Sequence, residues 1–143
     1  MMRLMHVEDD GDIREVAKMA LEFSGKFEVR QCASGEDAVE QIAGYNPDVL
    51  LLDVMMPGLS GPETLQQLRQ IDGFQDTPAI FMTARAQPSE IEELKALSAI
   101  TVVVKPFDPI TLGDQIIDAI RQAGAAAHPE QAAPVAGYDL KSA

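Results

Sequence analysis

Five short apolar segments alternate with five longer amphipathic segments along the first 123 residues of the chain. Apolar residues recur at helical spacing in the longer segments, whereas residues 49–52 form an unbroken apolar run, which is typical of a strand covered on both faces. This alternation predicts right-handed crossovers and an α/β fold in which helices cover both faces of a five-stranded parallel sheet. The expected strands are 4–7, 27–32, 49–52, 78–84 and 100–104.

Residues that favour helix N-termini precede each amphipathic segment. The clearest case is a Ser followed three residues later by a Glu, the capping-box spacing, at 60 and 63. The same kind of signal predicts where the other helices begin. The expected helix starts are Asp12, Ser34, Ser60, Ser89 and Asp108.

Length, composition and charge bound the class of protein. With 143 residues, 46% of them apolar, the chain fits one globular domain. Its single cysteine, Cys32, excludes an internal disulfide and favours a reducing cytoplasm. A net charge of −12 disfavours direct binding to nucleic acid or an anionic membrane, and we expect neither a signal peptide nor a membrane span. Residues 124–143 are rich in Ala and Pro without periodicity, so we expect a tail or linker there, with His128 exposed to solvent.

Charged and hydroxyl-bearing residues end or follow four of the expected strands. The carboxyl ends of parallel strands meet at one edge of a sheet, so we expect Glu8, Asp9, Asp53, Thr83 and Lys105 to lie together. Three neighbouring carboxylates raise one another's pKa, and a divalent cation removes this conflict. Hard oxygen ligands favour Mg²⁺. An Asp, a Mg²⁺ site, a Lys and a hydroxyl form a cradle for a transferring phosphoryl group, with Asp53 as the candidate nucleophile.

Four motifs occur in order at the ends of expected strands: "HVEDDGDIR", "LLLDVMMPGLSG", "FMTARA" and "VVVKPFDP". Together they resemble the receiver domain of bacterial two-component response regulators. The resemblance covers residues 1–123 and implies a flavodoxin-like, doubly wound (βα)5 fold. Asp10 falls outside the acid pair of the first motif, and we expect it to stabilise the turn.

The resemblance implies a specific set of metal ligands. Asp9 and Asp53 are expected to bind Mg²⁺ directly, joined by the backbone carbonyl of Met55. Glu8 is expected to act on the ion mainly through water.

The resemblance also implies the reaction and its partners. Asp53 is expected to accept a phosphoryl group from a sensor histidine kinase or a histidine phosphotransfer protein, while Thr83 and Lys105 contact the phosphoryl oxygens. The bond between Lys105 and Pro106 is usually cis in this family, and cis bonds are almost confined to proline. The expected function is a switch that changes contacts with a downstream protein target, not an enzyme. Self-association into a homodimer stays open.

The residues leave alternatives to weigh. A Mg²⁺-dependent phosphatase with an aspartyl nucleophile commonly has a second acid two residues later, where this chain has Met55, which argues against turnover. The complete set of acids, Thr and Lys argues against a degenerate receiver that serves only as an interaction module. A flavodoxin-like cofactor carrier would need a Gly-rich phosphate-binding turn and aromatic residues around a flavin, and the sequence lacks both. A receiver fragment of a longer output protein stays open.

One position departs from the family pattern. Many receivers carry Tyr or Phe three residues before the lysine, and this chain has Val102 there. Valine is stiff at χ1 and has no ring to turn inward. We therefore expect Thr83 to act through the segment 84–89 and the helix that follows it.

Overall fold

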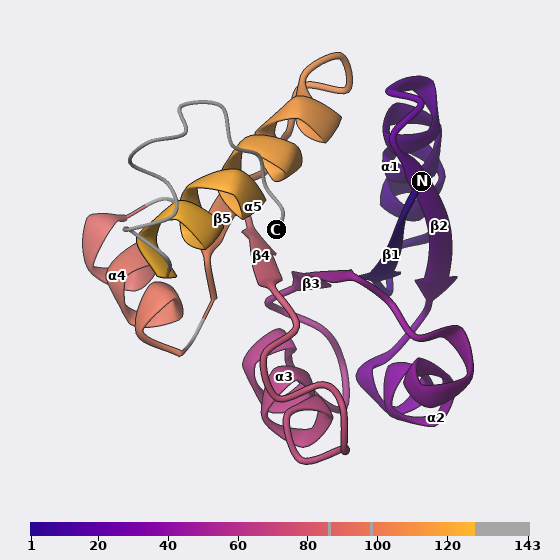
Figure 1. Cartoon of the computed structure of the whole chain (residues 1–143), viewed down its shortest axis with the longest axis vertical. Coiled ribbons are helices and arrows are strands. Elements are labelled where there is room, and N and C mark those ends of the chain that lie inside the picture. Colours follow the sequence, from indigo (N-terminus) through magenta and orange to yellow (C-terminus); the bar gives the residue numbers. More distant parts are fainter. Residues whose placement is uncertain (86, 98, 128–143) are drawn as a thin grey trace.

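The computed structural model describes residues 1–85, 87–97 and 99–127, and strands and helices alternate throughout (Figure 1). The strands differ from the expected ranges by at most two residues at either end. The elements in chain order are β1 (Met2–Val7), α1 (Gly11–Phe23), β2 (Phe27–Cys32), α2 (Gly35–Tyr45), β3 (Val49–Asp53), α3 (Gly61–Leu68), β4 (Ala79–Thr83), α4 (Pro88–Ala96), β5 (Thr101–Val104) and α5 (Leu112–Ala127).

The five strands form one parallel sheet in the order β2-β1-β3-β4-β5. One face is covered by α2, α3 and α4, with Ile42, Leu68 and Leu94 in its core. The opposite face is covered by α1 and α5, with Leu21 and Ile116 in its core. Every residue of β3 is buried, as the unbroken apolar run predicts for a strand covered on both faces. The expected α/β fold with helices on both faces is confirmed (Figure 1).

Two of the expected helix starts are confirmed. The Ser34 hydroxyl accepts from the backbone of Asp37, and Ser60 forms a reciprocal capping box with Glu63. The start of α1 is corrected, because Asp10 and not Asp12 is its N-cap. The Asp10 carboxylate accepts from the backbone N–H groups of residues 12 and 13. Asp10 therefore stabilises the turn after β1, as expected, and it does so by capping α1.

The starts of α4 and α5 also differ from expectation. Helix α4 begins with Pro88 after Gln87, since the ring of proline is preorganised for the first turn, and Ser89 lies inside the helix. Asp108 instead closes a turn by accepting from the backbone of Ile110, and α5 begins at Leu112. At its other end α5 extends to residue 127, so 124–127 are helical, whereas the rest of the expected tail, including His128, lies outside the described residues.

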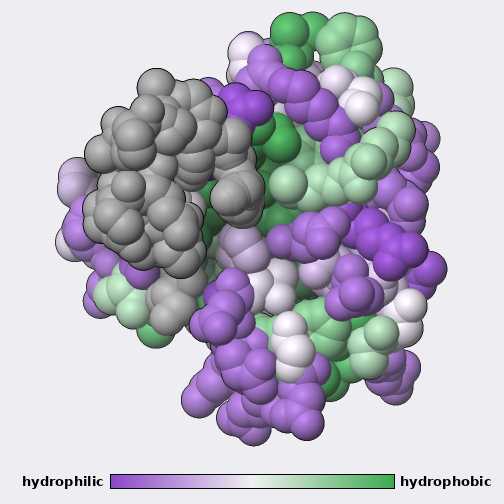
Figure 2. Space-filling view, in the orientation of Figure 1, coloured by the Kyte–Doolittle hydropathy of each residue, from purple (hydrophilic) through white to green (hydrophobic). Residues whose placement is uncertain are grey.

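Figure 2 shows hydrophilic residues interspersed with smaller apolar groups over one face of the molecule. None of the helices in the described ranges has both the length and the apolar character that a membrane span needs.

Candidate functional site

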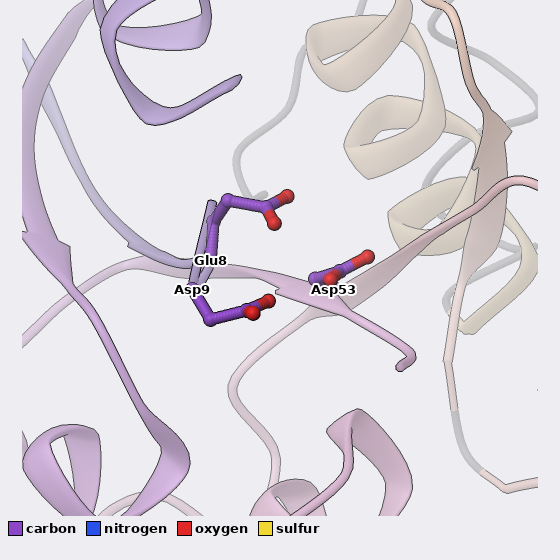
Figure 3. Close-up of side chains that lie close together, drawn as sticks. All are labelled: Glu8, Asp9 and Asp53. Atoms are coloured by element: carbon purple, nitrogen blue, oxygen red, sulfur yellow. The ribbon is translucent and has the colours of Figure 1, made fainter. Parts of the chain in front are cut away.

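Three carboxyl groups meet at the carboxyl ends of two neighbouring strands. Glu8 and Asp9 directly follow β1, and Asp53 is the last residue of β3, which pairs with β1. The side chains of all three extend into one space (Figure 3), and each offers an oxygen within 4.8 Å of the others. Glu8 and Asp53 are buried, whereas Asp9 is exposed. The expectation that these acids share one edge of the sheet is confirmed.

Lys105 brings a positive charge to two of these acids. It follows β5, and its backbone N–H donates to the carbonyl of Thr83 at the end of β4. The Lys105 Nζ lies 2.8 Å from Asp53 Oδ1 and 3.1 Å from Glu8 Oε1. The peptide bond to Pro106 is cis, as expected. The lysine therefore forms ion pairs with one acid of β3 and one that follows β1.

The pKa values of Glu8 and Lys105 reflect burial and mutual charge. Burial and the nearby charge of Asp53 raise the pKa of Glu8, although Lys105 and the backbone N–H of Asp10 partly oppose this. Burial alone would lower the pKa of Lys105, but its bonds to Asp53 and Glu8 outweigh burial and raise it. The ammonium of Lys105 is therefore stabilised in its charged form. Its one positive charge does not neutralise the three carboxylates.

Thr83 ends β4, and Met55 lies in the loop that follows β3. Thr83 is the buried last residue of β4, which pairs with β3, and its hydroxyl accepts from the backbone N–H of Arg85 at 3.0 Å. Met55 follows Asp53 by two residues and is 66% exposed. The five residues expected at this edge therefore all lie at the ends of their strands.

Comparison with known proteins decides the family. Residues 4–117 match the response regulator receiver domain along most of the chain. The chain belongs to the bacterial two-component receiver family. This receiver domain superposes on the chemotaxis response regulator CheY4 of Vibrio cholerae with a TM-score of 0.77 at 30% identity, covering 83% of this chain and 98% of that one. A putative response regulator of Chloroflexus aurantiacus gives 0.76 at 31% identity, covering 83% and 97%.

Longer relatives share the receiver domain as part of their length. Response regulator MprA of Mycobacterium leprae is 39% identical, covering 74% of this chain and 45% of MprA. Transcriptional regulatory protein CseB of Streptomyces avermitilis is 35% identical, covering 88% of this chain and 52% of CseB. The chain thus spans about half the length of these curated relatives.

The donor set of this receiver domain fits a hard divalent cation. It consists of carboxylate oxygens, the ligand type that Mg²⁺ prefers over sulfur or imidazole. Three carboxylates face a single ammonium, so the cluster carries a net charge of −2 when all four groups are ionised. The residues present could therefore hold Mg²⁺, and the exposed Asp9 leaves the cluster open to solvent.

The sequence did not single out a second group of residues that supports the site. Arg14 of α1 donates to the backbone carbonyls of Glu8 and Asp9, and Gln31 of β2 holds the backbone of Arg14. An arginine on a helix surface is ordinarily a solvated charge, so its type alone carries no signal. The contact becomes visible only once α1 is packed beside the end of β1.

Proposed function

We propose that this receiver domain accepts a phosphoryl group on Asp53 in a Mg²⁺-dependent reaction, and that the phosphorylated form changes its contacts with a downstream protein. The observation that carries the proposal is the Asp53 carboxylate, which lies 2.8 Å from Lys105 Nζ and shares its surroundings with Glu8 and Asp9. This arrangement combines a nucleophile, a fixed positive charge and a set of hard oxygen ligands.

In the proposed reaction an oxygen of Asp53 attacks the phosphorus of a phosphohistidine on a sensor kinase or phosphotransfer protein. The new P–O bond forms as the P–N bond breaks, and the histidine nitrogen leaves with the electron pair. Lys105 neutralises charge on the phosphoryl oxygens, and the Thr83 hydroxyl donates to one of them. Asp9 and Asp53 would hold Mg²⁺ with the Met55 carbonyl, and Glu8 would act on it through water. When bound, the ion supplies further charge stabilisation.

Met55 distinguishes this proposal from a phosphatase. A thioether cannot give or take a proton, so the position two residues after Asp53 offers no general acid or base for rapid turnover. The proposed function is therefore that of a phosphorylated switch rather than an enzyme.

We also propose that the domain acts in the cytoplasm, where its buried thiol, Cys32, stays reduced.

The test is labelling by a small phosphodonor. Acetyl phosphate with Mg²⁺ should add one phosphoryl group to the wild-type chain, detected by intact-mass spectrometry, and EDTA should prevent it. Asp53→Ala should stay unlabelled. Equal labelling of wild type and Asp53→Ala would refute Asp53 as the acceptor.

The output of the switch is proposed to run through α4. The Thr83 hydroxyl accepts from the Arg85 N–H, and the Arg85 guanidinium is paired with Glu90 of α4 at 3.1 Å. When Thr83 turns to the phosphoryl group, this backbone contact is lost, and the two states differ in how α4 is held. Amides of residues 87–97 should change hydrogen-exchange protection on phosphorylation in wild type and much less in Thr83→Ala. An unchanged pattern in wild type would place the output on another surface.

A further inference from the structure

Arg14 clamps the backbone that carries both acids following β1. Its Nη1 donates to the carbonyl of Glu8 at 2.8 Å and to the carbonyl of Asp9 at 3.1 Å. These carbonyls lie just past β1, whose pairing with β2 and β3 ends at Val7. The guanidinium therefore restrains the two residues whose side chains face Asp53, without touching their carboxylates in the contacts described.

Gln31 of β2 holds Arg14 in turn. Its Nε2 donates to the Arg14 carbonyl at 2.7 Å and lies 3.1 Å from Nδ1 of His6. An amide nitrogen can only donate, so Nδ1 of His6 accepts and the ring is neutral, with its proton on Nε2. His6 and Gln31 are direct partners in the register of β1 and β2, and His6 is fully buried. The contacts join β1, β2 and α1, which lie together in Figure 1, into one support beneath the acids.

We propose that Arg14 is a positioning residue for the metal site, and that Gln31 keeps it in place. The inference rests on the proposed function, because it assigns how the Mg²⁺ ligands of that function are held. Hydrogen-bonded partners behind metal ligands orient them and change metal affinity when removed. Here the hydrogen bonds act on the backbone of Glu8 and Asp9.

Charge and positioning predict opposite results when Arg14 is removed. A guanidinium near a divalent cation repels it, so the loss of its charge alone would tighten Mg²⁺ binding. If the guanidinium holds the acids in their binding geometry, its loss weakens Mg²⁺ binding in spite of the relieved repulsion. The sign of the change in affinity therefore separates the two roles.

The experiment compares Arg14→Met with Lys18→Met in the full chain. Lys18 lies one turn further along α1, is exposed and pairs only with Glu22 in the contacts described, so it matches the loss of charge without the clamp. Mg²⁺ affinity is measured by calorimetric titration with MgCl₂, and folding is checked by thermal unfolding. We expect Arg14→Met to bind Mg²⁺ about tenfold more weakly than Lys18→Met. At saturating Mg²⁺, Arg14→Met should recover the labelling rate of Lys18→Met with acetyl phosphate, a split that general loss of stability would not give.

Two further variants keep the inference testable if Arg14→Met folds poorly. Arg14→Lys retains the repelling charge but not the guanidinium whose Nη1 donates to both carbonyls, so it should bind Mg²⁺ more weakly than wild type. Gln31→Leu keeps Arg14 but removes the hydrogen bond that Gln31 donates to the Arg14 carbonyl. This variant should therefore also bind Mg²⁺ more weakly than wild type.

The outcomes separate this inference from the proposed function. Mg²⁺ binding by Arg14→Met as tight as by Lys18→Met, or tighter, overturns the positioning role while the proposed function stands. A wild-type chain that binds no Mg²⁺ overturns both.

Discussion

Burial of His6 makes the stability of the fold sensitive to acid. The imidazole is fully buried in β1 and accepts from Gln31 in its neutral form. Burial, with the nearby charges of Lys105 and Arg14, lowers the pKa of His6 from 6.5 to about 3. The unfolded chain therefore binds a proton that the folded chain excludes. The stability that neutral His6 contributes is complete above pH 6.5 and is lost as the pH falls from 6.5 toward 3.

The size of the effect follows from the two pKa values. At pH 5 an exposed imidazole is almost fully protonated, whereas the His6 ring in the fold is not. Proton linkage then lowers the free energy of unfolding by about 2 kcal/mol between roughly pH 7.5 and pH 5. The raised pKa of Glu8 acts with the opposite sign, because the folded chain keeps that proton more readily. The contribution of His6 must therefore be taken as a difference between two chains.

The assay is urea unfolding of wild type and His6→Leu, followed by circular dichroism at both pH values in EDTA. Leucine removes the titrating group and keeps an apolar side chain in the strand. On moving to the lower pH, the wild-type midpoint should fall by about 1 M urea more than that of His6→Leu, for a slope near 2 kcal/mol/M. Equal shifts in the two chains would show that His6 takes up its proton within the fold, and would refute the argument from burial.

Three further predictions concern the candidate site and the residues next to it. Asp9→Asn should weaken Mg²⁺ binding in a calorimetric titration more than Glu8→Gln does, and the reverse ranking would exchange their roles. Met55→Asn and Arg85→Ala should change the decay rate of the phosphorylated form measured by intact mass, whereas unchanged decay in both would contradict a role for this pair. Gly61→Ala places a Cβ 2.4 Å from a backbone carbonyl of β3, so it should lower the free energy of unfolding by about 1–3 kcal/mol. Gly44→Ala meets nothing within 4 Å and serves as its control in urea unfolding.

The edge of the sheet could be predicted because it depends on chain order and periodicity alone. Parallel strands bring their carboxyl ends together, so Asp53 at the end of the most apolar strand was expected at the same edge of the sheet as the residues that follow β1. The unbroken apolar run also predicted that β3 is covered on both faces, and every residue of the strand is buried. These inferences do not require any side-chain contact to be known.

Helix starts were less predictable because several residues in a row can cap. Asp10 and Asp12 are both suited to accept from free backbone N–H groups, and the short turn after β1 selects the earlier one. At α4 the sequence predicted a start at Ser89, but the helix begins at Pro88, whose fixed φ suits the first turn. This helix has no side-chain cap. Local sequence thus predicted that a helix follows each strand and left its first residue to the geometry of the connection.

The support beneath the acids shows what lies beyond such patterns. A histidine in an apolar strand requires a hydrogen-bond partner when it is buried, and this much follows from its type. Its partner is Gln31 because the register of β1 and β2 sets these two residues opposite one another. The same amide reaches the backbone of Arg14, and through it the carbonyls that carry the acids. The residues proposed to react could be found from strand ends, whereas those that hold them depend on register and packing, which only the assembled fold determines.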